Sequence, residues 1–408
     1  MANIFKVTDL VAKESLRIAH EKLQFIGTVD RQYDESFVPR GSGSPHGSTL
    51  RVKNPNQYTR RTGHAMAVQA QNETTQTITV ATLNGVDMSF NHQELIQSVD
   101  NDGAFDDLSK NYIVPAISSL CSGIESDFIA FATKATADVV GTAGTPLTDL
   151  VVPGAARARL NQHAAPKDGM RMIQCDSVTM GSLVNGLRGL FQDSAQIKEQ
   201  YREGMIGRTA MADWYENDRM WTMPNSADVA GALNLGVGVV LASGVTVATV
   251  DGFTAAPVAG MVFTFDAVFD VHPETKAAFP HLKQFVITSA TTTSFNFSPA
   301  IINDPADPRQ NCVGEAGDND VVTFVGSLST NYVQNLMYHK EAYQFITAPL
   351  PILDDAQKCV RVTKDNLSLR AWMSSDIRNN ELLMRIDILY GMAALKPEWG
   401  VRMIGAAG

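Results

Sequence analysis

Two extended limbs, joined by a stretch with few large apolar residues, constrain this chain more than any other feature. Residues 48–53 read Ser-Thr-Leu-Arg-Val-Lys, and residues 76–83 alternate polar and apolar side chains as half-buried strands do. The first limb follows a flexible Gly-, Ser- and Pro-rich stretch at residues 41–47. A limb of about 15 residues reaches roughly 50 Å at the strand rise. Because this hairpin has little apolar surface to bury on itself, we predict that a neighbouring molecule covers it.

Charge is segregated over the same part of the chain. Residues 36–72 hold five basic side chains and no acidic ones, whereas residues 73–109 hold seven acidic side chains and no Lys or Arg. Opposite charges in neighbouring stretches favour complementary surfaces between copies of one chain, although separately solvated faces remain an alternative. The predicted inter-subunit contact residues are Arg40, Arg51, Lys53, Arg60, Arg61, Asp87, Glu94, Asp100, Asp102, Asp106 and Asp107.

Two segments have helical periodicity. Residues 8–25 predict an amphipathic helix that is capped by Thr8 and ended by Gly27, and that behaves as an arm docking elsewhere. Residues 105–137 predict a longer helix, with Pro115 in its first turn and a rod of about 30 Å or more after it. Its apolar residues recur at spacings of three and four: Ile113, Ile117, Leu120, Ile124, Phe128 and Phe131.

The composition changes near Pro224. From there to about Thr330 the chain is rich in Val, Thr, Phe and Gly, which favours short strands with frequent turns in a small antiparallel barrel or sandwich. The candidate strands are residues 237–241, 245–250, 261–271, 283–289, 294–297 and 321–325. Residues 145–224 mix loops with short helical pieces such as 180–192, and residues 335–408 should rejoin the main body.

Bulk composition restricts the class of protein. Hydrophobic residues make up 44% and charged residues 19% of the 408-residue chain, which is typical of a globular protein. The net charge of −10 disfavours a protein whose task is to grip nucleic acid. The sequence lacks an apolar run long enough to span a bilayer and a secretory signal pattern. The cysteines are widely spaced, which predicts buried thiols in a reducing compartment: Cys121, Cys175, Cys312 and Cys359.

Catalytic and metal-binding motifs are not evident. There is no phosphate-binding G-x-x-x-x-G-K-[ST] loop and no G-x-S-x-G elbow, and residues 98–109 fit a calcium loop poorly because Ser109 stands at the bidentate Glu position. Arg385 and Asp387 share one face of a predicted strand and should form a structural ion pair. A further acidic group suits a solvated or partner-facing loop better than a metal site: Asp304, Asp307, Glu315, Asp318 and Asp320. We therefore predict no catalytic residues, no metal and no cofactor.

Several stretches resemble, in order, the coat proteins of short-tailed bacteriophages that carry an extra β domain in the tailed-phage and herpesvirus capsid fold. Residues 14–33 resemble the N-terminal arm of that family, and residues 47–55, Gly-Ser-Thr-Leu-Arg-Val-Lys-Asn-Pro, with 60–63 resemble its extended loop. Residues 111–127 resemble the start of the spine helix of that family. The resemblance continues in the same order through seven further stretches: residues 204–208, 213–216, 260–265, 271–276, 284–288, 385–391 and 395–398.

The resemblance implies an α+β tailed-phage capsid fold with an inserted small antiparallel β-barrel. It implies an N-terminal arm at residues 1–37, an extended loop at 38–90, a peripheral domain with the spine helix at 91–144 and an axial/peripheral region at 145–224. The inserted barrel would occupy residues 225–330, and residues 331–408 would return to the axial and peripheral domains. Lys53 is the only lysine of the extended loop and no partner Asn can be named for it, so we expect non-covalent assembly.

The function implied is that of a major capsid protein, not an enzyme, which self-assembles into the icosahedral shell around a double-stranded DNA genome. Its implied partners are its own copies in hexamers and pentamers, a scaffolding protein, the portal vertex and, in some relatives, a decoration protein. The packaged DNA would be touched without sequence specificity, and no membrane would be bound. The protein would assemble in the host bacterial cytoplasm and reside in the virion. The alternatives are a bacterial nanocompartment shell protein, a hydrolase with an accessory β domain, and a receptor-binding tail protein.

Overall fold

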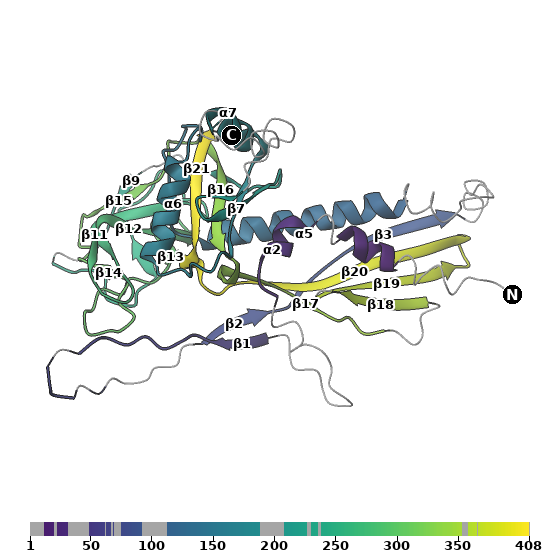
Figure 1. The fold of residues 1–408 in the computed structure, drawn as a ribbon, viewed down its shortest axis with the longest axis horizontal. Helices are drawn as coiled ribbons and strands as arrows, with labels where there is room; N and C mark the ends of the chain where they lie inside the picture. Colours follow the sequence, from purple (N-terminus) through teal and green to yellow (C-terminus); the bar gives the residue numbers. More distant parts are fainter. Residues whose placement is uncertain are drawn as a thin grey trace. The chain divides into compact units, whose positions relative to one another are not determined.

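The structure is a computed structural model that describes residues 12–19, 23–31, 49–61, 63–66, 68, 75–91, 112–187, 208–226, 230–235, 238–352, 358–364 and 366–407. The chain forms two compact units, each built from separated stretches of sequence. Unit 1 contains Met1–Val52, Thr75–Phe128 and Tyr343–Ala393, and unit 2 contains Lys53–Thr74, Ile129–Ala342 and Ala394–Gly408. The described part of the chain combines helices with many strands, which confirms the predicted α+β class (Figure 1).

Unit 1 is built on a five-stranded sheet in the order β17-β20-β19-β18, with β3 on the other side of β20. Its strands are β3 (Thr82–Asn91), β17 (Tyr343–Ala348), β18 (Lys358–Lys364), β19 (Leu367–Asp376) and β20 (Glu381–Ala394). Strand β3 pairs antiparallel with β20 from Asn91 opposite Glu381 to Thr82 opposite Tyr390. Along β3 the partly buried Val86, Met88 and Phe90 alternate with exposed residues, and they lie opposite the apolar residues Ile386, Met384 and Leu382 of β20.

The long helix α5 (Val114–Ala135) contributes its first residues, up to Phe128, to unit 1. Pro115 lies in its first turn, as predicted, and the side chains of Ile117, Ile124 and Phe128 are buried. The ring of Phe128 lies 5.0 Å from Phe25 and 5.4 Å from Phe345, measured between centroids. The start of the predicted helix, residues 105–111, lies outside the described residues.

The N-terminal segment differs from the single helix predicted over residues 8–25. Residues 12–19 are helical, and a separate short helix α2 (Gln24–Thr28) contains Gly27, so the predicted stop at Gly27 was wrong. Leu23, directly before α2, has a φ of −84° and a ψ of 83°, which are not helical. In α2 the side chain of Phe25 is buried, and its backbone N–H donates to the buried carboxylate of Glu125 at 2.6 Å.

Unit 2 contains a mixed sheet in the order β4-β21-β16-β5-β7-β6, with β8 also paired to β16. Helices α6 (Val151–Gln162) and α7 (Ser177–Leu187) bury Ala156, Leu160 and Leu183 in one cluster with apolar residues of the mixed sheet. Helix α7 starts before the predicted Met180, and residues 188–192 of that prediction lie outside the described residues. The strands are β4 (Val139–Val140), β5 (Arg171–Cys175), β6 (Arg208–Thr209), β7 (Ala212–Glu216), β8 (Thr222–Pro224), β16 (Asn331–His339) and β21 (Gly400–Ala407), and the short 3-10 helices are η3 (Lys340–Ala342) and η4 (Pro397–Trp399).

A second, antiparallel sheet of unit 2, which we call the β module, spans residues 230–324 in the order β10-β13-β12-β11-β15-β9, with β14 paired to β11. Its edge strands meet, because Leu233 after β9 bridges Val250 after β10, so the sheet closes into a barrel. The predicted strand at residues 237–241 was wrong: between the turns at Gly238 and Gly244, Val240 makes only an isolated bridge to Gly317. The strands are β9 (Ala230–Ala232), β10 (Val247–Thr249), β11 (Val262–Val271), β12 (Ala278–Ala290), β13 (Ser294–Ser298), β14 (Cys312–Val313) and β15 (Val321–Phe324).

The β module has an aromatic core of its own. Phe263 lies opposite Phe285 on β12 and opposite Phe324 on β15 in the strand register. The ring centroid of Phe263 is 5.0 Å from that of Phe295 and 5.1 Å from that of Phe265. Such edge-on and tilted pairs add to the burial of large apolar area, so this cluster supplies much of the stability of the module.

Candidate functional site: surfaces for subunit contact

The first candidate surface is the loop that connects β1 (Thr49–Lys53) to β2 (Thr75–Thr79), two strands that pair with each other. We call its described residues, 54–61, 63–66 and 68, the connecting loop. Arg51 and Lys53 are exposed on β1, and Arg60 and Arg61 are exposed in the connecting loop. The structure therefore brings these predicted contact residues onto one hairpin, whereas Arg40 lies outside the described residues.

Arg61 shapes the connecting loop. Its Nη1 atom donates to the carbonyl oxygen of Gly63 at 2.7 Å and to that of Ala65 at 2.8 Å. These bonds close a turn in which Gly63 has a φ of +96°, a conformation that glycine adopts without a steric penalty. Arg61 therefore has a structural role within the chain that the sequence did not indicate, and Arg60 is the better probe of contact with another molecule.

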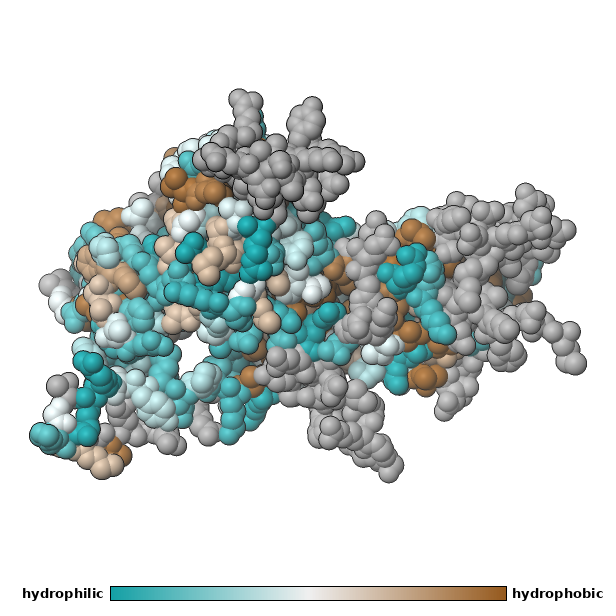
Figure 2. All heavy atoms as spheres, in the orientation of Figure 1, coloured by the Kyte–Doolittle hydropathy of each residue, from teal (hydrophilic) through white to brown (hydrophobic). Residues whose placement is uncertain are grey.

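The connecting loop also exposes apolar side chains. Tyr58 is 56% exposed, Met66 84% and Val68 82%. Figure 2 shows hydrophilic and hydrophobic residues side by side along this loop, at the lower left of the view. Exposed apolar area of this kind, next to cations, is typical of a surface that another protein covers. Sequence reasoning missed these residues because they have no periodicity.

A groove of about 660 Å³ separates the connecting loop from part of the β module, within unit 2. Residues 54–57, Thr59 and Val68 line it from the connecting loop, and Glu398 and several residues between Pro299 and Asn311 complete the lining. Its floor is ordered by local contacts: Arg309 forms an ion pair with Asp307 at 2.8 Å, and Lys276 Nζ donates to the carbonyl oxygen of Pro308 at 2.6 Å. The lining is mainly polar, so the groove suits hydrated contacts better than an apolar ligand.

The acidic residues near the groove do not converge on one point. Asp304 accepts from the backbone N–H of Ala306, Asp318 from that of Leu235, and Asp320 from that of Gly317. Asp304 and Asp320 therefore each stabilise a local turn, whereas Asp318 links its loop to the backbone at Leu235. Across the described ranges, no group of three or more His, Cys, Asp or Glu side chains has the arrangement of a metal site.

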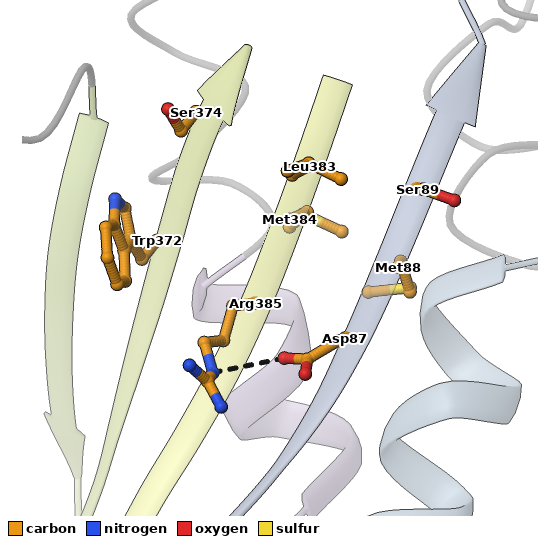
Figure 3. A pocket seen from close by; sticks show the side chains of 8 residues that line it. All are labelled: Asp87, Met88, Ser89, Trp372, Ser374, Leu383, Met384 and Arg385. Atoms are coloured by element: carbon orange, nitrogen blue, oxygen red, sulfur yellow. Dashed lines mark ion pairs between the residues drawn. The ribbon is translucent and has the colours of Figure 1, made fainter. Parts of the chain in front are cut away.

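The second candidate surface is the face of the unit 1 sheet around Asp87 (Figure 3). Asp87 lies directly opposite Arg385 in the β3–β20 register, and Arg385 Nε is 3.1 Å from Asp87 Oδ1 and 3.0 Å from Asp387 Oδ1. Arg370 on β19 completes the row through Nη2, 2.6 Å from Asp387 Oδ2. The predicted Arg385–Asp387 pair is thus present, and Asp87 extends it.

A pocket of about 420 Å³ borders this row of charges. Trp372, Leu383 and Met384 supply its apolar lining, and Asp87 and Arg385 supply its charged edge (Figure 3). Leu383 is 43% exposed. The remaining predicted acidic contact residues, Glu94, Asp100, Asp102, Asp106 and Asp107, lie outside the described residues, so the pairing of basic and acidic surfaces between copies stays a prediction.

Comparison with known proteins adds a family assignment. Residues 224–405 match the family model described as P22 coat protein, gene protein 5. This region includes the β module, β16 to β21 and the whole row from Arg370 to Asp387. The match confirms the prediction of a bacteriophage coat protein, and it covers somewhat less than half of the chain.

Solved structures with a similar arrangement are distant in sequence. One from Mycobacterium phage Che8 is 10% identical, with 93% of this chain and 90% of that chain covered and a TM-score of 0.47. The capsid of Ralstonia phage GP4 is 9% identical, with 93% and 87% covered and a TM-score of 0.46. The capsid structure of Staphylococcus phage Andhra is 9% identical, with 94% and 84% covered and a TM-score of 0.43. None of the curated proteins matches the chain.

The protein has no helix, within its described ranges, that is long and apolar enough to cross a membrane. Its four cysteines form no disulfide within the described residues: Cys121, Cys175 and Cys312 are buried, and Cys359 is partly buried. Burial raises the pKa of the Cys312 thiol to about 11, so this side chain is a neutral apolar group near pH 7.

Proposed function

We propose that this coat protein is the major shell subunit of a tailed bacteriophage, which assembles with its own copies into an icosahedral shell of hexamers and pentamers around double-stranded DNA. The family match over residues 224–405 carries this proposal. The protein would act as a structural subunit rather than by catalysis, would assemble in the host cytoplasm and would reside in the virion. A scaffolding protein, a portal vertex and, in some shells, a decoration protein would be its partners.

The proposed division of labour follows the predicted boundaries. Residues 1–37 would serve as the arm, 38–90 as the extended loop, 91–144 as the peripheral domain with α5, 225–330 as the inserted barrel, and 145–224 with 331–408 as the axial and remaining peripheral parts. The exposed apolar residues Tyr58, Met66 and Val68 support a covered connecting loop. Their burial against a neighbour would supply binding energy, and the surrounding Arg and Lys side chains would set the register.

Charge exchange between copies is energetically feasible at Asp87. Its partner Arg385 is 49% exposed and Asp87 itself is 70% exposed, so their ion pair is strongly screened by water. Exposed pairs of this kind contribute only about 0–1 kcal/mol. An arginine such as Arg60 from a neighbouring connecting loop can therefore replace or join Arg385 at little cost, and a shell would repeat the contact many times.

The shell function is tested by negative-stain electron microscopy of the purified full chain, alone and coexpressed with the scaffolding protein encoded beside it. We expect closed particles of uniform diameter in the coexpressed sample. Soluble subunits without particles in both samples would refute the shell function, and uniform particles formed by the chain alone at a single small diameter would favour a nanocompartment.

The role of the connecting loop is tested by Arg60→Glu, with Arg157→Glu on the exposed side of α6 as the matched charge reversal. We expect Arg60→Glu to reduce the particle yield while the subunit keeps the wild-type unfolding temperature, because Arg60 is exposed within the monomer. Arg157→Glu should leave the yield near wild type. Equal yields for wild type and Arg60→Glu would exclude an electrostatic role for this loop.

A further inference from the structure

A buried group of charges joins the β module to helix α6 inside unit 2. Asp270 on β11 is fully buried, and its Oδ1 accepts from Lys283 Nζ on β12 at 2.9 Å. The other oxygen, Oδ2, is 3.2 Å from His281 Nε2, 3.5 Å from His163 Nε2 and 3.8 Å from Arg159 Nη1. The Asp270 carboxylate of the β module thus lies near two basic side chains of its own sheet and near two side chains from α6 and its C-cap.

His163 completes the group. Its Nε2 atom lies 2.9 Å from Oδ2 of Asp138, the residue immediately before β4, so the ring faces two carboxylates. Asp138, His163 and Lys283 are each at most 5% exposed. Buried charges are costly unless they are paired, so a neutral His163 would leave the two carboxylates with less compensation.

A β-bulge in β11 creates this geometry. The pairing of β11 with β12 shifts register between Thr264 and Phe269, and Ala267 has a φ of +62°. Before the bulge, Phe263 and Phe265 point into the aromatic core, and after it Val268 does. Asp270, two residues further along, therefore lies on the same face of the strand as Val268. Without the bulge, regular alternation from Phe265 would have placed Asp270 on the opposite face.

The group connects two apolar clusters that do not share residues. Phe263 and Phe285 belong to the core of the β module, whereas Ala156 and Leu160 of α6 pack with the mixed sheet. The ion pairs of Asp270 link the two clusters directly, because they join β11 and β12 to α6 and its C-cap. We propose that Asp138, His163 and Asp270 form a pH-dependent lock that holds the β module on helix α6.

The electrostatics give the direction of the pH effect. Burial alone would lower the pKa of His163, but the carboxylates of Asp138, 2.9 Å away, and Asp270 outweigh burial and Lys283, so its pKa is raised above about 6.5. Burial would raise the pKa of Asp138 and of Asp270, but their cationic partners hold both below the usual range. The other titratable groups near this site are Arg159 and His281, which lie close to Asp270, and Glu398, which interacts with Lys283.

The lock has a defined pH window. A histidine with a raised pKa stabilises the folded contact at low pH and loses that contribution as pH rises through its folded-state pKa. The two aspartates, with lowered pKa values, contribute above about pH 4 and lose their contribution as pH falls. The lock is therefore strongest in mildly acidic to neutral solution and opens on the alkaline side. A cavity of about 20 Å³ beside His163 and Lys283 is large enough for one water molecule.

The test is hydrogen exchange of the full-length subunit between pH 5 and pH 9, after correction for the intrinsic pH dependence of exchange. In wild type we expect faster exchange in β11 and β12, relative to β5, once His163 loses its proton. Each pKa unit of the His163 shift corresponds to about a tenfold change in the opening equilibrium. Exchange of the imidazole C2 hydrogen, read by mass spectrometry, should give His163 a pKa above about 6.5.

Variants decide between a lock and a static ion cluster. His163→Gln should show fast exchange at every pH and no step, whereas His64→Gln, at an exposed loop histidine, should keep the wild-type step. Asp138→Asn should move the step to lower pH, because His163 loses its nearer carboxylate. A wild-type profile without a step, or the same step in His163→Gln, would overturn the proposal. Should His163→Gln fail to fold, the wild-type profile and the Asp138→Asn shift still decide it.

Discussion

The β module and the connecting loop illustrate two ways of using apolar side chains. In the β module, Phe263 and its aromatic neighbours are buried against one another within one chain. In the connecting loop, Met66 and Val68 are more than four-fifths exposed, and local hydrogen bonds of Arg61 close the turn. The first region obtains its stability from its own fold, whereas the second is suited to gain stability from a neighbouring molecule.

The sharpest test of this contrast is Phe263→Ala. The substitution removes the ring that faces Phe285 and Phe324 in the register and leaves a cavity in the core. We expect it to lower the free energy of unfolding by about 3–5 kcal/mol, the range for a buried Phe-to-Ala change. Chemical unfolding followed by tryptophan fluorescence measures it.

Phe279→Ala is the control for that experiment, because Phe279 is only partly buried and stacks on His281 at 5.3 Å. We expect it to cost about 1 kcal/mol. Similar losses for the two variants would mean that the aromatic cluster is not the main source of stability in the module.

A smaller loss is expected for Gly260→Ala at the start of β11. Gly260 has a φ of +99°, and an added Cβ would lie 2.6 Å from Trp221 Cη2 and 3.0 Å from Lys134 Cγ. Gly238→Ala is the matched control, because Gly238 also has a positive φ of +77° but nothing lies within 4 Å of its added Cβ. Both variants carry the backbone penalty, so their difference isolates overpacking, which costs about 1–3 kcal/mol. Equal unfolding temperatures would show that Trp221 can move aside.

The smallest effect is expected in the connecting loop itself. Arg61→Ala removes the hydrogen bonds to Gly63 and Ala65, whereas Arg60→Ala leaves them in place. Since exposed hydrogen bonds contribute about 1 kcal/mol or less, chymotryptic cleavage after Tyr58 should accelerate at most about fivefold in Arg61→Ala. The unfolding temperature should stay at the wild-type value in both variants. A large drop for Arg61→Ala would mean that this loop is part of the folded core.

Much of the fold was predictable where large apolar residues are periodic. The α5 helix, with Ile117, Ile124 and Phe128 buried, follows from its 3.6-residue repeat, and β11 and β13 follow from alternating Phe residues. The prediction failed at residues 237–241, where two turns flank a short apolar run and only Leu241 is buried. The β propensity of these residues does not distinguish a loop that buries one apolar side chain from a strand.

The candidate contact surfaces were predictable only in part. Segregated charge pointed to Arg60 and Asp87, but the row from Asp87 through Arg385 to Asp387 depends on the β3–β20 register, which joins residues about 300 positions apart. The structural role of Arg61 likewise depends on a turn whose conformation is not encoded in a recognisable motif.

The amino-acid sequence by itself determined the α+β class, the long helix, the aromatic strands of the β module and the separation of basic from acidic stretches. These properties depend on side-chain type and short-range periodicity. Tertiary structure alone decided that the barrel closes through Leu233 and Val250 and that a bulge turns Asp270 toward His163. Strand register and bulges bring distant residues together, and a one-residue shift moves a side chain to the opposite face of a sheet.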